Sequence, residues 1–118
     1  MSQPVPLNIS PKELNKILED DFSEKPFIVD VREDDEIAIA SFSFSVLHLP
    51  LSKAANWSGN IGELLPKDQS IVVICHSGVR SLNFGIWLLE KGLSKRVLNL
   101  VGGIDAWSTD IDQSVPRY

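Results

Sequence analysis

Four consecutive residues in the middle of the chain, Ile71 to Ile74, constrain the fold more than any other feature. The run Ile-Val-Val-Ile is apolar at every position, so both faces of the strand that it predicts must be covered. Such strands occur in parallel sheets with helices packed on both sides. Further apolar runs at 27–31, 46–49 and 97–101 alternate with helix-like segments. The sequence therefore predicts an α/β domain with a largely parallel sheet.

The segments between these runs carry helix signals. Ser10 stands as an N-cap before Pro11 at the first helical position, and apolar residues follow at helical spacing. A second helix is predicted over 81–91, where a following glycine is placed to end it. We expect shorter helical segments at 61–65 and before Trp107.

Two segments allow more than one interpretation. Residues 33–36 are four consecutive acids, which suit either a solvated surface patch or the positive N-terminal end of a helix. We favour a structural role for this run. Phe42, Phe44 and Val46 alternate with serines, which predicts a strand with one buried face, with 46–49 as its firmest part.

Length and charge restrict the class of protein. The 118 residues fit one compact domain, and a net charge of −5 argues against nucleic-acid or anionic membrane partners. A single cysteine excludes an intrachain disulfide. The start of the chain lacks a signal-peptide pattern, and the apolar segment 37–51 is shorter than the roughly 20 residues that span a bilayer. We expect a cytoplasmic monomer with loosely ordered tails at 1–6 and 108–118.

The only cysteine lies where the predicted central strand ends. Ligands of open parallel sheets bind at the carboxyl ends of the strands, and Cys75 is followed there by a polar loop that contains a glycine. The loop has no proline, so each residue keeps its backbone N–H, and a loop that curls around the sulfur forms an anion-binding nest. The N-terminus of the next helix adds positive potential. Both features favour the reactive thiolate.

Arg80 bears on the same chemistry. A guanidinium about 4 Å from the sulfur would favour the thiolate by at most roughly 4 kcal/mol at an effective dielectric of 20. A lone cysteine at a strand end is often an inert core residue, but the order of strand, Cys75, polar loop, arginine and helix favours a reactive one. Two histidines and one cysteine do not make a zinc site. Gly102-Gly103 lacks the third glycine of a dinucleotide fingerprint, so we expect neither metal nor cofactor.

Several segments together resemble the rhodanese family of sulfurtransferases. Residues 75–81, Cys-His-Ser-Gly-Val-Arg-Ser, and residues 97–107, Val-Leu-Asn-Leu-Val-Gly-Gly-Ile-Asp-Ala-Trp, are similar to the second half of a rhodanese domain. Upstream, 28–33 resembles the family's Asp-Val-Arg-Glu strand end, 49–51 its apolar-Pro-Leu element, and 65–68 the turn before its catalytic strand. Each motif is short, but their order and spacing are specific, and the match spans nearly the whole chain.

The resemblance implies one rhodanese-like domain over 1–118, with a five-stranded, mostly parallel sheet and helices on both faces. It implies that Cys75 takes a sulfane sulfur from a donor such as thiosulfate, holds it as a persulfide, and passes it to cyanide, a thiol or a protein partner. Asp30 and Arg32 would support the site, or form a structural ion pair at a strand end. The resemblance also assigns persulfide and substrate binding to the loop residues His76, Ser77, Gly78, Val79 and Arg80.

One segment departs from the family pattern. Family members often carry Gly-His-Ile-Pro-Gly-Ala where residues 40–45 read Ala-Ser-Phe-Ser-Phe-Ser, which affects the wall near the active site and the range of substrates.

Two other functions share these features. A phosphatase or arsenate reductase of the same fold needs five residues between cysteine and arginine, whereas four separate Cys75 from Arg80. A sulfur carrier that does not turn over, or a redox-sensing or docking module, would use the same cysteine and loop.

Overall fold

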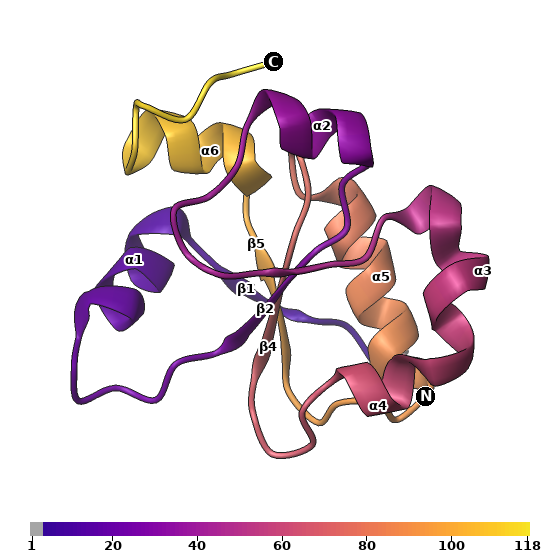
Figure 1. Cartoon of the computed structure of the whole chain (residues 1–118). Helices are drawn as coiled ribbons and strands as arrows, with labels where there is room; N and C mark the ends of the chain where they lie inside the picture. Colours follow the sequence, from indigo (N-terminus) through magenta and orange to yellow (C-terminus); the bar gives the residue numbers. More distant parts are fainter. Residues whose placement is uncertain (1–3) are drawn as a thin grey trace.

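The computed structural model describes residues 4–118 and contains one sheet with helices on both faces (Figure 1). The strand order is β1-β5-β4-β2-β3, and every neighbouring pair is parallel. These features confirm the predicted α/β class with a five-stranded sheet. The strands are β1 (Leu7–Ile9), β2 (Phe27–Asp30), β3 (Leu47–His48), β4 (Ile71–Ile74) and β5 (Val97–Leu100).

Strand β4 lies at the centre of the sheet, between β2 and β5, as its composition predicts. All four of its residues are fully buried. The backbone pairing with β2 continues one residue past the end of β2, since Val31 N donates to Ile74 O, the last residue of β4, at 3.0 Å. The carboxyl ends of β2 and β4 therefore lie side by side, directly before the segments that carry the candidate site.

Helices cover the two faces of the sheet in separate groups. The α-helices are α1 (Pro11–Glu19), α2 (Asp34–Ile39), α3 (Ala54–Trp57), α4 (Ile61–Leu64), α5 (Val79–Glu90) and α6 (Gly103–Asp110), with 3₁₀ turns η1 (Leu51–Lys53) and η2 (Ser58–Asn60). In Figure 1, α1 and α6 lie on one side of the strands, and α3, α4 and α5 on the other. Each group packs on its own hydrophobic cluster. Helix α2 lies over the carboxyl edge of the sheet.

Local signals place the helix ends well. The Ser10 hydroxyl accepts from Glu13 N and the Glu13 carboxylate accepts from Ser10 N, both at 3.1 Å, so a capping box begins α1. Helix α5 begins at Val79, two residues before the predicted start, because Gly78 adopts a positive φ of 105° and turns the chain directly into the helix.

The predicted strand over residues 41–46 is wrong. The alternation in burial is real, because Phe42 and Phe44 are half-buried and stack on each other while their serine neighbours are exposed. Both rings also pack edge-on against Trp107. They reach the core from an irregular segment without strand pairing, and β3 is confined to Leu47–His48.

The acidic run begins helix α2, which is one of the two interpretations that the sequence allows. Glu33 caps α2, and the following acids form its first turn, where the positive end of the helix favours them. Asp34 and Asp35 are exposed. Glu36, however, turns toward the candidate site and keeps only 15% of its side chain exposed.

The two expected tails are more closely packed than their composition suggests. At the N-terminus, Pro6 is buried; residues 1–3 of that tail lie outside the described residues. At the C-terminus, Ser108 is buried and donates to Val115 O at 2.6 Å, and Val115 is itself buried. Polar composition alone misjudged the C-terminal segment, because it holds the buried Val115, the partly buried Ile111 and an aromatic last residue, Tyr118.

Over residues 4–118, no helix combines the length and apolar character needed to cross a lipid bilayer.

Candidate active site

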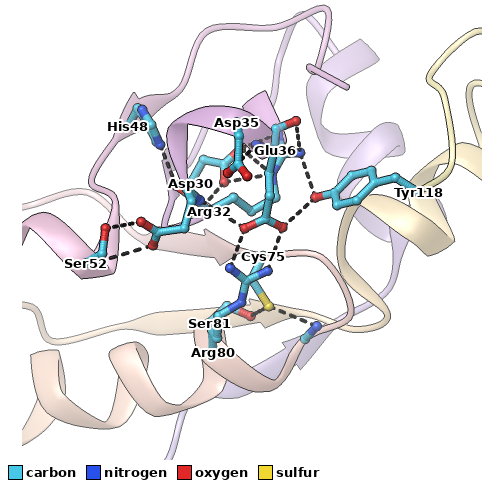
Figure 2. Close-up of polar contacts among 12 residues, drawn as sticks. Asp30, Arg32, Asp35, Glu36, His48, Ser52, Cys75, Arg80, Ser81 and Tyr118 are labelled. Carbon is cyan, nitrogen blue, oxygen red and sulfur yellow. Dashed lines mark hydrogen bonds and ion pairs between the residues drawn. The ribbon is translucent and has the colours of Figure 1, made fainter. Parts of the chain in front are cut away.

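The cysteine and the charged residues singled out from the sequence meet at the carboxyl edge of the sheet. Cys75 directly follows β4, Asp30 ends β2, and Arg80 is the second residue of α5. Figure 2 shows Asp30, Arg32 and Arg80 converging with Glu36 above the sulfur of Cys75. The topology explains this grouping, because parallel strands deliver their following loops to one edge.

The sulfur of Cys75 sits inside the loop that follows it. The Gly78 backbone N–H donates to Sγ at 3.0 Å, and the Ser81 hydroxyl lies 3.2 Å from Sγ. Burial raises the pKa of the thiol, but hydrogen bonds from the Ser81 hydroxyl and from the backbone N–H groups of Ser81, Gly78 and Ser77 outweigh it, so the Cys75 pKa is lowered. The loop therefore stabilises the thiolate, as the absence of proline predicts.

Helix α6 holds the outer side of the same loop. Ile104 N donates to Cys75 O at 2.9 Å, and Asp105 N donates to His76 O at 3.1 Å. These bonds hold the carbonyl groups of Cys75 and His76 on the side of α6. The backbone N–H groups of Ser77, Gly78 and Ser81 point to the sulfur. So close a contact requires glycine at position 103, because a Cβ there would lie 2.3 Å from Cys75 O.

A second polar contact supports the loop from β5. The Ser81 hydroxyl lies 2.5 Å from Asn99 Oδ1, and Asn99 Nδ2 donates to Gly78 O at 3.0 Å. The hydroxyl has one proton, so it donates to Asn99 beside a Cys75 thiol and must turn toward sulfur beside a thiolate. Sequence reasoning gave Asn99 no role; the signal was one polar residue in an otherwise apolar strand.

Arg80 does not stand free beside the sulfur. Its guanidinium forms a bidentate pair with Glu36, with Nη1–Oε1 and Nη2–Oε2 distances of 2.6 and 2.8 Å. This pairing, above all, lowers the pKa of Glu36 to about 2, so the carboxylate stays ionised near neutral pH. The sequence predicts a positive charge near Cys75, whereas the structure adds a carboxylate that compensates it.

Asp30 and Arg32 form a separate, buried ion pair. Both side chains are at most 1% exposed, and Arg32 Nη2 lies 2.9 Å from Asp30 Oδ2. Arg32 Nε donates to both carboxylate oxygens, and Arg32 Nη1 donates to the Tyr118 hydroxyl at 3.0 Å. The two residues thus form the ion pair at a strand end that the sequence offers as one of two alternatives.

The last residue of the chain borders the active loop. The Tyr118 ring stacks on His76 with centroids 4.1 Å apart, and its hydroxyl donates to Glu36 Oε2 at 2.8 Å. Burial, chiefly, raises the pKa of Tyr118 to about 12. No pattern in the sequence indicated this contact, because Tyr118 and Glu36 are 82 residues apart.

The remaining predicted site residues have simpler surroundings. Ser77 is exposed on the loop, Gly78 turns the chain into α5, and Val79 is exposed as the first residue of that helix. His48, which is not among the predicted site residues, has Nε2 at 2.5 Å from Arg32 O. Within residues 4–118, no group of three or more His, Cys, Asp or Glu side chains is arranged to hold a metal ion.

Replacing Ser81 by alanine is expected to raise the pKa of Cys75 and to slow its alkylation by iodoacetamide at pH 7 by about tenfold. A hydrogen bond to a charged group contributes about 1.5 kcal/mol, which corresponds to that change in thiolate fraction. The alkylation rate, followed from pH 5 to pH 10, should have its midpoint below the ordinary thiol value in the wild type and higher in Ser81→Ala. Ser43→Ala, an exposed serine outside the loop, is the control; equal midpoints in all three proteins would contradict the assignment.

The chain is similar to known proteins along most of its length. The family model described as "Rhodanese-like domain" matches residues 10–110. A protein of Allochromatium vinosum named "Sulfurtransferase" is 37% identical over 86 residues, which cover 73% of this chain and 75% of that protein. The "Rhodanese-like/PpiC domain-containing protein 12, chloroplastic" of Arabidopsis thaliana is 36% identical over 113 residues, 94% of this chain. The chain spans only 37% of the length of that plant relative.

A solved structure shares the fold. The rhodanese-like domain protein from Staphylococcus aureus superposes with a TM-score of 0.70 at 26% identity, covering 95% of this chain and 98% of the other. The match therefore extends over the whole sheet and both helical layers rather than over the active loop alone.

Proposed function

Because the chain belongs to the rhodanese-like domain family, we propose that it is a sulfurtransferase that carries a sulfane sulfur as a persulfide on Cys75. The observation that most supports this function is the environment of Sγ, which receives hydrogen bonds from the loop backbone and lies beside the Ser81 hydroxyl. The Allochromatium relative is itself named a sulfurtransferase. The loop offers a compact cradle for one added sulfur atom rather than for a phosphoryl group.

The proposed reaction has two displacement steps. The Cys75 thiolate attacks the outer sulfur of thiosulfate, the S–S bond of the donor breaks, and sulfite leaves with the electron pair. The outer sulfur of the resulting Cys75 persulfide is then attacked by cyanide or a thiolate. That second S–S bond breaks toward Cys75, thiocyanate or a new persulfide leaves, and the thiolate is restored.

The loop residues are assigned by their positions around the sulfur. We assign the N–H groups of Ser77 and Gly78 to the persulfide anion, since they already stabilise the thiolate. His76, Val79 and Arg80 form the rest of the binding loop. Asp30 and Arg32 are proposed as supporting residues that hold the edge of the sheet. The guanidinium of Arg32 donates hydrogen bonds to Asp30, Glu36 O and the Tyr118 hydroxyl.

Intact mass spectrometry after incubation with thiosulfate tests this function. The wild type should gain the mass of one sulfur, and cyanide should remove it with catalytic formation of thiocyanate. Cys75→Ser should gain nothing, because Cys75 is the only cysteine of the chain. No adduct with thiosulfate, mercaptopyruvate or polysulfide would contradict a small-molecule sulfurtransferase.

A sulfur carrier that serves a protein partner is the second candidate. Cys75 is 1% exposed, so a persulfide on it would be shielded from most thiols and would discharge only to an acceptor that can open the loop, as a carrier requires. The plant relative is named for two kinds of domain and is much longer than this chain, which indicates that such domains occur within larger proteins. Many cycles of thiocyanate formation per protein would favour the enzyme, and a single slow discharge would favour the carrier.

A further inference from the structure

Each basic side chain named below, around the active loop, contacts another side chain. Arg80 is paired with Glu36, and the buried Arg32 is paired with Asp30. The His76 ring is covered on one side by Tyr118. Two outer ion pairs complete the set, Lys53 with Asp34 and Arg117 with Asp105. Among the described residues of this region, each lysine or arginine that an anionic substrate would approach is therefore already paired with a carboxylate.

Glu36 is fixed in place by contacts on several sides. Besides the two bonds from Arg80, its carboxylate accepts from the Tyr118 hydroxyl at 2.8 Å and from Glu33 N at 3.0 Å. Tyr118 is in turn bound by Arg32. With 15% of its side chain exposed, Glu36 cannot simply swing into solvent, and Arg80 must break two charged hydrogen bonds to turn toward a substrate.

A cavity of about 550 Å³ borders Arg80 on the side of α3. Among the described residues that line this cavity, Arg80 is the only charged one, and the others are apolar or neutral. The remaining lining residues are Leu51, Ala54, Trp57, Ser58, Asn83, Phe84 and Trp87. The space next to the site therefore suits a small apolar group better than a second negative charge.

We propose that Glu36 determines donor specificity: by neutralising Arg80, it disfavours the thiosulfate dianion and selects sulfur donors that carry one negative charge or none, such as an organic thiosulfonate or persulfide. The proposal rests on the sulfurtransferase function proposed above. With a thiosulfonate, the Cys75 thiolate attacks the outer sulfur, the donor S–S bond breaks, and a sulfinate leaves with the electron pair. Thiosulfate reacts in the same way but brings twice the charge.

Glu36→Gln tests the proposal with two matched donors, thiosulfate and methanethiosulfonate. The amide keeps one oxygen for Arg80 Nη1 and Glu33 N but removes the charge. We expect kcat/KM to rise about tenfold for the dianion and about threefold for the monoanion, because the electrostatic free energy scales with donor charge. Both gains should shrink as salt is added. Adding Arg80→Gln should reverse them.

Asp35→Asn is the control, since it removes one exposed charge from the same helix without any contact to Arg80. It should change the ratio of the two donors by less than about twofold. Equal changes for both donors in Glu36→Gln, including an equal loss through misfolding, would overturn the proposal.

Alkylation of Cys75 separates this proposal from the sulfurtransferase function. Iodoacetate carries one negative charge and iodoacetamide none, so Glu36→Gln should raise the iodoacetate-to-iodoacetamide rate ratio by about threefold. An unchanged ratio would overturn the proposal even if sulfur transfer occurs. A raised ratio without any sulfur adduct would support the charge selection while contradicting the sulfurtransferase function.

Discussion

Replacing Gly103 by alanine is expected to lower the free energy of unfolding by about 2–4 kcal/mol and to slow the alkylation of Cys75. The added Cβ would lie 2.3 Å from Cys75 O and 2.5 Å from His76 O. Both obstacles are backbone atoms of the active loop, so they cannot move aside as a flexible side chain would. Overpacking costs about 1–3 kcal/mol, and the positive φ of 59° adds roughly 1 kcal/mol for alanine.

Gly92→Ala is the matched control for this substitution. Gly92 also has a positive φ, 66°, but nothing lies within 4 Å of an added Cβ. Urea denaturation should show a loss of about 1 kcal/mol for Gly92→Ala, and its Cys75 should react normally. Similar losses in the two variants would mean that α6 yields easily and does not hold the loop.

The predicted parts of the fold are those encoded in continuous segments. Strand β4 was predictable because four consecutive apolar residues need cover on both faces. The loop around Cys75 was predictable for a similar reason, since its donors and the following helix are contiguous in the chain. Strand β1, with three residues at the sheet edge, is too short for a periodic pattern, so only the family resemblance implied a fifth strand.

The errors come from contacts between distant segments. Arg80 and Glu36 are 44 residues apart, so no spacing rule predicts that the arginine is neutralised. Phe42 and Phe44 have the alternation of a strand, but an aromatic partner in α6 buries them without strand pairing. Composition described the C-terminal tail as polar, whereas Tyr118 reaches back to the active loop.

The electrostatics of the site depends on two kinds of contact, those within the loop around Cys75 and those between distant segments of the chain. The donors around Cys75, which are the Ser81 hydroxyl and the backbone N–H groups of Ser81, Gly78 and Ser77, are local, and together they lower the pKa of its thiol. The side-chain charge that would attract an anionic donor depends on Glu36, Arg80 and Tyr118, which come from three distant segments. The sequence therefore predicted the family and the loop around Cys75, but not the contacts that we propose select the donor.

Replacing Asp30 by asparagine is expected to lower the free energy of unfolding by about 3–5 kcal/mol, the usual cost of leaving one partner of a buried ion pair uncompensated. The new amide oxygen would still accept from Arg32 N, but the amide nitrogen would direct a donor at the Arg32 guanidinium. The Arg32 side chain is fully buried, so water cannot replace the lost carboxylate oxygen. Urea denaturation at pH 7 measures the loss.

The double variant Asp30→Leu with Arg32→Met shows whether the loss comes from the unpaired charge. An apolar pair of similar size leaves no buried ion, so the double variant should be more stable than Asp30→Asn, although it forfeits the bonds from Arg32 to Tyr118 and to Glu36 O. In the cold, where the folded state predominates, Asp30→Asn should still load sulfur on Cys75. A folded Asp30→Asn that cannot form the persulfide would instead make Asp30 part of the chemistry, because stability alone would no longer explain the loss.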